Sequence, residues 1–154
     1  MLILGYGNPD RGDDAAGALT VTKLRELGVP AEEFSGDGIG LLETWSASED
    51  VIVIDAMVSG GEPGSIRAWE DPARSMEGGY SLCSTHGIGI ADAVRLGGVL
   101  GRLPGRLTIF GIEAAQFERG AEPSPAVAAA AAGLAAKIAA DRGGAEARSN
   151  RGSP

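Results

Sequence analysis

Cysteine, histidine and aromatic residues are scarce in this chain of 154 residues, which has one cysteine, one histidine and only 5% aromatic residues. A single cysteine excludes an intrachain disulfide and a zinc site built from several cysteines. We expect Cys83 to be a small, partly buried thiol. The only histidine, His86, is the one imidazole that the sequence offers for proton transfer near neutral pH or for metal binding.

Long apolar runs and an excess of basic residues are also missing. No apolar segment approaches the roughly 18 residues that a membrane span needs, and no basic segment precedes the apolar run after Met1, so we expect neither a membrane segment nor a signal peptide. The 13 basic and 21 acidic residues give a net charge of −8, which disfavours binding to nucleic acid or to an anionic membrane. The sequence predicts a cytoplasmic protein.

What the chain does contain is typical of one folded domain. Hydrophobic residues make up 44% of the 154 residues, which is close to the globular average and enough for one core. Residues 143–154, GGAEARSNRGSP, have no apolar periodicity. We therefore expect one domain over residues 1–142, a flexible C-terminal tail over residues 143–154, and a monomer.

Apolar runs typical of strands alternate with segments typical of helices. The expected strands are residues 2–5, 31–34, 51–55, 65–69 and 107–112, and the expected helices are residues 13–27, 39–46, 89–100 and 125–140. This alternation predicts an α/β fold in one domain, with a mostly parallel sheet of about five strands and helices on both faces. It is the three-layer arrangement of phosphorylase/hydrolase-like folds.

Polar side chains stand at three junctions between these segments. Asp14 comes after the first strand, Asp55 closes the run VIV, and His86 precedes the helix at 89–100. Because the carboxyl ends of parallel strands share one edge of the sheet, these three side chains are expected to converge there. Two carboxylates and one imidazole could form an open half-shell for Zn, Ni, Fe or Mn.

Each of these residues also has an ordinary structural explanation. Asp13 and Asp14 suit the first turn of a helix, Asp55 could cap a turn, and a lone histidine is often a loop residue. A carboxylate that closes a buried strand must nevertheless be hydrogen-bonded or ligating, because burying it unpaired is costly.

The glycine loop after the first strand suggests a nucleotide site as an alternative. Gly5 and Gly7 match the start of G-x-G-x-x-G, and Asp37 could take the place of the ribose-binding acid, but the third glycine position is Asp10. A carboxylate there would repel a pyrophosphate. The sequence has no Walker motif and no Gly-x-Ser-x-Gly elbow, and a Cys83–His86 nucleophile pair is a further alternative.

Four blocks of the sequence, in order, resemble the hydrogenase maturation proteases. Residues 5–17, GYGNPDRGDDAAG, resemble the family's N-terminal signature: G-x-G-N after a strand, four variable residues, Asp, Asp or Glu, and a Gly three residues later. The other blocks are residues 51–59 (VIVIDAMVS), 85–92 (THGIGIAD) and 107–113 (LTIFGIE). The resemblance runs over residues 2 to about 140.

The resemblance implies an endopeptidase that removes the C-terminal extension of a nickel–iron hydrogenase large-subunit precursor after nickel insertion. It implies that Asp14, Asp55 and His86 contact nickel that the precursor's cysteines hold, with no tightly bound resident metal. Some family members have Glu where this chain has Asp14, so the backbone there should lie closer to the metal. The neighbouring parts of the cleft are implied to be Gly5, Gly7, Asn8, Gly36, Asp37, Gly38 and Gly87.

Two other functions stay open at this point. The same three residues could hold a resident metal in a hydrolase of small molecules, or the Gly5–Gly7 loop could belong to a non-enzymatic nucleotide-binding module.

Overall fold

Six strands form one sheet in the computed structural model, which describes residues 1–76, 81–82 and 88–149. The strand order is β2-β1-β3-β6-β4, and β5 pairs with β3 off this path. The pairs among β2, β1, β3 and β6 are parallel, whereas β4 and β5 are antiparallel to their partners. The strands are β1 (Leu2–Tyr6), β2 (Glu32–Phe34), β3 (Asp50–Val58), β4 (Ile66–Trp69), β5 (Ser81–Leu82) and β6 (Arg106–Glu113).

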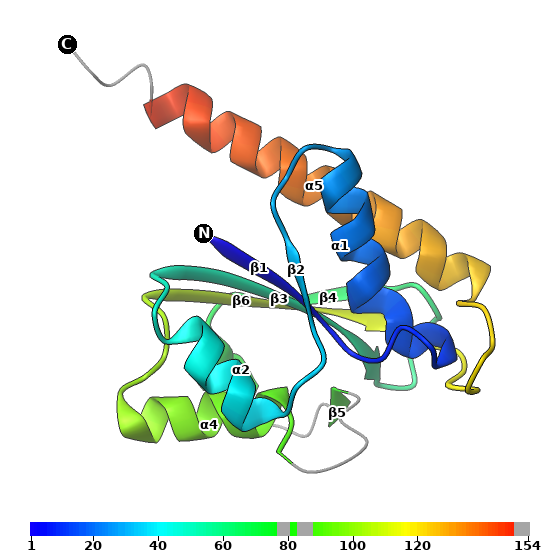
Figure 1. The fold of residues 1–154 in the computed structure, drawn as a ribbon, viewed down its shortest axis with the longest axis horizontal. Coiled ribbons are helices and arrows are strands. Elements are labelled where there is room, and N and C mark those ends of the chain that lie inside the picture. The colour runs from blue at the N-terminus through cyan, green and yellow to red at the C-terminus, as the bar shows by residue number, and fades with distance from the viewer. Residues whose placement is uncertain (77–80, 83–87, 150–154) are drawn as a thin grey trace.

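Helices cover both faces of the sheet. They are the 3₁₀ helix η1 (Gly12–Ala15) and the α-helices α1 (Ala16–Glu26), α2 (Gly38–Trp45), α3 (Pro72–Ser75), α4 (Ile90–Leu100) and α5 (Pro125–Ser149). Figure 1 shows α1 and α5 on one face, and α2 and α4 on the other.

Each face of the sheet has its own apolar core, and β3 contributes to both. Ile54 and Ala56 pack with α1 and α5, whereas Val53 and Met57 pack with α2 and α4. Side chains alternate across a strand, so a strand buried on both faces needs the continuous apolar run that the sequence has here. The expected three-layer α/β fold is confirmed.

Close packing of α1 fixes the end of β1. A Cβ atom on Gly17 would lie 2.4 Å from the carbonyl oxygen of Tyr6 and 2.6 Å from that of Ile54. The helix backbone therefore rests directly on β1 and β3, and only glycine fits at this position. This contact places η1, immediately before α1, against the end of the sheet.

Two element ends lie beyond the expected positions. β3 continues past Asp55 to Val58, because β6 pairs with it up to Met57 and β5 pairs with its last two residues. Helix α5 continues past Ala140 to Ser149, so residues 143–149 of the expected tail are helical, and residues 150–154 lie outside the described residues. Two glycines at 143 and 144 each weaken a helix by only about 1 kcal/mol, and helix-forming residues flank them.

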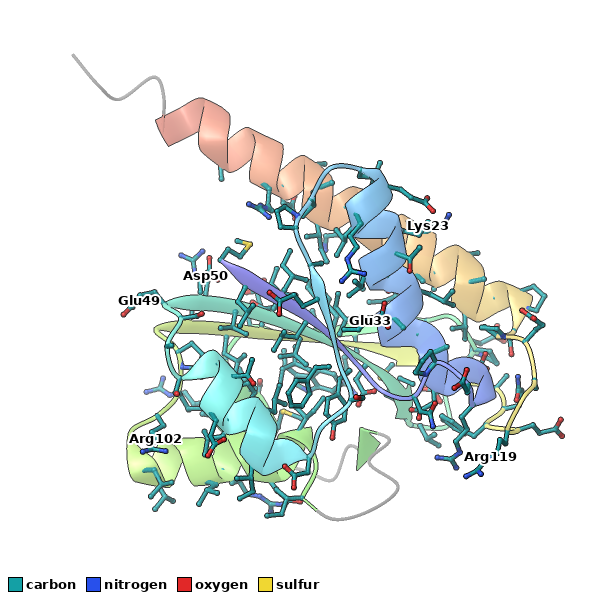
Figure 2. The ribbon with its side chains drawn as sticks, viewed as in Figure 1. Lys23, Glu33, Glu49, Asp50, Arg102 and Arg119 are labelled. Carbon is teal, nitrogen blue, oxygen red and sulfur yellow. The ribbon has the colours of Figure 1, made fainter. Side chains whose placement is uncertain are left out.

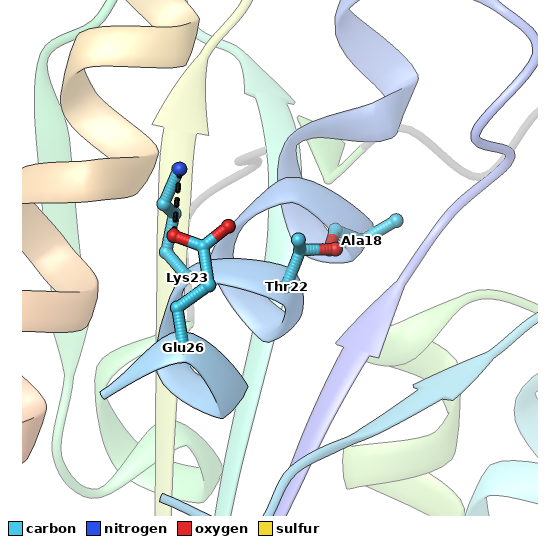
Figure 3. Close-up of polar contacts among 4 residues, drawn as sticks. All are labelled: Ala18, Thr22, Lys23 and Glu26. Carbon is cyan, nitrogen blue, oxygen red and sulfur yellow. Dashed lines mark hydrogen bonds and ion pairs between the residues drawn. The ribbon is translucent and has the colours of Figure 1, made fainter. Parts of the chain in front are cut away.

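The outer face of α1 carries ordinary surface contacts. Figure 3 shows Lys23 paired with Glu26 at 2.8 Å, and the Thr22 hydroxyl donating to the Ala18 carbonyl at 3.1 Å. An exposed pair of this kind contributes only about 0.2–0.5 kcal/mol. In the part of the chain that the structure describes, none of the helices has the length and apolarity that a membrane crossing requires.

Candidate functional site

Two of the three predicted site residues, Asp14 and Asp55, lie toward the end of the sheet at which β1 finishes. Beyond β1, residues 7–11 lead to η1, which packs against β3. Figure 2 places Arg119 at this end of the sheet and Glu49 and Asp50 at the other. Sites in open α/β sheets form beyond the carboxyl ends of the strands, so the candidate site lies at the end with Arg119.

Asp14 is held by the glycine loop that follows β1. The backbone N–H of Asn8 donates to Asp14 Oδ2 at 3.1 Å, and the Asn8 side chain accepts from the N–H of Asp10 at 2.9 Å. Gly7 has φ +125°, and a Cβ there would lie 2.3 Å from the Asp14 carbonyl oxygen. Asp14 is 4% exposed, and its Oδ1 atom has no hydrogen-bond partner among the described residues.

Asp55 lies inside β3 rather than at its end, and it is fully buried (0% exposed). By strand alternation its side chain is on the same face as Val53 and Met57, the face that α2 and α4 cover. Its Oδ1 atom accepts from the N–H of Ala56 at 2.8 Å, whereas Oδ2 has no partner in the described part of the chain.

Burial disfavours the ionised form of both carboxylates. Burial raises the pKa of Asp55 well above its ordinary value, the charge of Asp14 raises it further, and the Ala56 N–H only partly opposes the shift. Burial also raises the pKa of Asp14, against the lowering effects of the Asn8 N–H and the nearby Arg11 charge. Buried carboxylates that each have one oxygen without a partner in the described part of the chain are suited to bind a cation or to exchange a proton.

Tyr6, the last residue of β1, borders this pair. It is 8% exposed, and its ring stacks on Phe34 with 5.8 Å between centroids and 19° between planes. Burial raises the pKa of its hydroxyl, and the charges of Asp55, Asp37 and Asp14 raise it further. The phenol is therefore a neutral hydrogen-bond donor at physiological pH.

The predicted cleft loop at residues 36–38 begins helix α2. Asp37 caps the helix by accepting from the N–H of Gly40 at 2.9 Å, and the N–H of Gly38 donates to the carbonyl of Ile88 at 2.7 Å. Gly36 lies against the Phe34 ring, since a Cβ there would be 2.7 Å from it. The start of α2 therefore contacts the segment that enters α4.

The remaining predicted residues, His86 and Gly87, lie outside the described residues, as does Cys83. Gly5 lies in β1 against α1, where a Cβ would be 2.3 Å from the Gly17 carbonyl oxygen. Among the described residues, no three His, Cys, Asp or Glu side chains form a cluster that could hold a metal. The described part of the site is thus a pair of carboxylates, Asp14 and Asp55.

Comparison with known proteins supplies the family. The model of HycI, hydrogenase maturation protease, matches residues 36–141. This chain belongs to the hydrogenase maturation protease family. The match covers more than half of the chain and includes Asp55, while Asp14 precedes it. The family expected from the sequence is confirmed.

Individual proteins agree with this assignment. The chain is 29% identical over 134 residues to the hydrogenase expression/formation protein HupD of Rhodobacter capsulatus, covering 83% of this chain and 64% of HupD. The chain spans 59–64% of the length of the curated relatives that it matches.

Two solved structures from Thermococcus kodakarensis also match the fold. The nickel–iron hydrogenase maturation protease HycI has a TM-score of 0.70 and 26% identity, covering 90% of this chain and 88% of that one. HybD of the same organism, also titled a nickel–iron hydrogenase maturation protease, has a TM-score of 0.70 and 26% identity, covering 91% and 96%.

This maturation protease homologue holds Asp13 in a way that the sequence did not predict. Asp13 is 0% exposed and caps neither η1 nor α1. Its Oδ2 atom accepts from the N–H groups of Ala115 (2.7 Å) and Gln116 (3.1 Å) and from the Ser124 hydroxyl (2.7 Å), and its Oδ1 atom accepts from the Ser124 N–H (2.6 Å). Burial disfavours ionisation of Asp13, but these hydrogen bonds outweigh it and lower the pKa. Asp13 thus ties the Asp14 helix to the segment between β6 and α5.

Glu113, at the end of β6, makes a second connection of this kind. It is buried, and its carboxylate accepts from the N–H groups of Ser59 and Gly60 and from the Ser59 hydroxyl, at 2.7–3.2 Å. It therefore fixes the loop that follows β3, which begins at Ser59, four residues after Asp55. Glu113 was only the last residue of a block in the sequence, and the one signal for its role was an acid closing an apolar strand.

Proposed function

We propose that this protein removes a C-terminal extension from the precursor of a nickel–iron hydrogenase large subunit, after the precursor has received its nickel. The observation that carries the proposal is the buried pair Asp14 and Asp55, each with one oxygen that has no partner among the described residues. Its family membership supports the reaction type. The precursor's nickel is part of the substrate.

His86 is proposed as the third group that contacts this nickel. Its support comes from the chain on either side of the undescribed stretch. Asp55 faces the layer of α2 and α4, and Ile88, two residues after His86, accepts a hydrogen bond from Gly38 at the start of α2. A carboxylate pair with one imidazole suits nickel, whose ligands include both oxygen and nitrogen donors.

The proposed reaction is attack of water on the scissile peptide bond. The precursor's nickel can orient the bond and polarise the carbonyl or the water. A carboxylate of the pair takes a proton from the water and then gives it to the leaving amine. A raised carboxyl pKa favours this proton transfer. The loop 7–11 holds the first carboxylate, and β3 holds the second.

Mass spectrometry of a nickel-loaded precursor tests this function. The wild type should remove a C-terminal fragment, whereas Asp14→Asn, Asp55→Asn and His86→Ala should each slow processing by about 100-fold or more. Glu26→Gln, on the exposed face of α1, is the matched control and should process normally. Equal processing by all variants would refute the site, and equally fast cleavage of nickel-free precursor would refute the requirement for nickel.

A hydrolase of small molecules with a resident metal is the second candidate, because the same unpaired carboxylate oxygens would also suit a bound cation. Metal analysis of the purified protein separates the two: we expect no stoichiometric metal, and tightly held Zn or Mn would favour this second function. The nucleotide alternative has less support, because the Asn8 N–H of the glycine loop already donates to Asp14.

A further inference from the structure

Tyr6 occupies the variable position of the G-x-G-N signature, and the sheet places it beside Asp55. Leu4 pairs with Val53 and Gly5 with Ile54 in the parallel register of β1 and β3, so Tyr6 follows next to Asp55. Leu4 and Val53 belong to the core under α2 and α4, and so does Tyr6. Because side chains two residues apart share a face, Tyr6 and Asp55 lie on the same face of neighbouring strands.

The ring of Tyr6 is held by packing, while its hydroxyl has no hydrogen-bond partner among the described residues. The ring stacks on Phe34 and is largely buried. The hydroxyl makes no hydrogen bond to any residue in the described part of the chain, although the carboxylates of Asp55, Asp37 and Asp14 are close enough to disfavour its ionisation. A fixed phenol among carboxylates stays protonated and can donate one hydrogen bond.

Hydrolysis of a peptide needs a donor for the oxygen that becomes negative. The carboxylate that takes the proton from water must be ionised, so it accepts hydrogen bonds and cannot supply one to this oxygen. The N–H groups that contact the pair, those of Asn8 and Ala56, already donate to Asp14 and Asp55. Tyr6 lies on the same sheet face as Asp55, and its hydroxyl is a donor that no described residue engages.

We propose that Tyr6 is a catalytic residue whose hydroxyl donates a hydrogen bond to the carbonyl oxygen of the scissile peptide bond; this rests on the proposed endopeptidase function. Water adds to the carbonyl carbon as a carboxylate of the pair takes its proton, and the carbonyl electron pair moves to the oxygen. Tyr6 stabilises that oxyanion and keeps its own proton. The carbon–nitrogen bond then breaks, and the carboxylic acid returns its proton to the amine.

Tyr6→Phe removes the hydroxyl and keeps the ring that stacks on Phe34. Loss of one oxyanion donor reduces kcat by about 100-fold to 1,000-fold. We therefore expect Tyr6→Phe to process nickel-loaded precursor with kcat reduced about 100-fold, KM within about threefold of wild type, and an unchanged Tm. Phe34→Leu is the control for packing: it loses the stack and keeps the hydroxyl, so it should lower Tm while kcat falls only a few-fold.

The outcomes distinguish this proposal from the one on which it depends. An active wild type with Tyr6→Phe within threefold of its kcat overturns the role of Tyr6 alone. Equal losses of kcat in Tyr6→Phe and Phe34→Leu, with equally lowered Tm, also overturn it, because packing then explains the effect. A wild type that leaves the nickel-loaded precursor uncut overturns the endopeptidase function itself, and with it the role of Tyr6.

Discussion

Replacement of Asp13 by alanine should destabilise the fold more than replacement of an exposed acidic residue. The carboxylate accepts four hydrogen bonds, from the N–H groups of Ala115, Gln116 and Ser124 and from the Ser124 hydroxyl, at 2.6–3.1 Å. The partners are 102 to 111 residues away in the sequence. The change therefore releases a long-range connection, whereas loss of a helix cap would act only locally.

The magnitude follows from the number of bonds and the exposure of their donors. A hydrogen bond to a charged group contributes about 1.5–3 kcal/mol when it is buried, so four would give at most about 6–12 kcal/mol. Ala115 is exposed and Gln116 and Ser124 are half-buried, so water can replace much of what their donors lose. We expect a net loss of about 3 kcal/mol, a large part of the 5–15 kcal/mol that is usual for a domain.

The loss should depend on pH. The folded pKa of Asp13 lies below its unfolded value, so ionised Asp13 contributes full stability above the unfolded pKa of about 3.9. That contribution falls as the pH drops through the folded pKa. The difference in stability between the wild type and Asp13→Ala should therefore be constant from pH 6 to 8 and shrink below about pH 4.

Urea denaturation at pH 7 measures the effect. Asp10→Ala is the matched control, because Asp10 is exposed and its contacts in the described residues come from its backbone N–H and carbonyl. Asp10→Ala should stay within about 0.5 kcal/mol of the wild type. If Asp13→Ala also stays within about 1 kcal/mol, or if its effect does not change with pH, the reasoning about this carboxylate is wrong.

Three further predictions concern other buried positions. Asp55→Asn should raise the free energy of unfolding by about 1–2 kcal/mol at pH 7, because it removes a buried charge whose Oδ2 atom has no partner among the described residues. The pKa of Asp55 is raised on folding, so this gain should vanish on acidification. A loss of stability at pH 7 in denaturation curves would contradict the site geometry. Gly17→Ala should lower stability by about 2 kcal/mol or more, because its Cβ would clash with backbone atoms. Gly133→Ala, in open space on α5, should raise stability by about 0.5–1 kcal/mol. Similar Tm shifts in the two variants would argue against the close packing of α1 on β1 and β3. Glu113→Ala should destabilise the fold by about 2 kcal/mol and speed hydrogen exchange of the Ser59 amide. Unchanged exchange there would contradict the role of Glu113 in fixing the loop after β3.

The sequence by itself determined the order of the main elements and predicted Asp14 and Asp55 as site residues. Continuous apolar runs identified β1, β3 and β6, because strands buried on both faces can carry few polar side chains. Asp55 was identifiable for the same reason, since a carboxylate within such a run needs a partner or a function. The resemblance to the family supplied the remaining candidates, and among them His86 and Gly87 remain predictions.

Only the tertiary structure shows what Asp13 does in the fold. Asp13 and Asp14 are neighbours with the same chemistry, yet Asp13 receives four hydrogen bonds from residues beyond β6, whereas Oδ1 of Asp14 has no hydrogen-bond partner among the described residues. The lengths of β3 and α5 and the position of Tyr6 beside Asp55 likewise depend on pairing between distant segments. Local patterns carry no record of such contacts, because they form only when strands and loops far apart in the chain are brought to the same edge of the sheet.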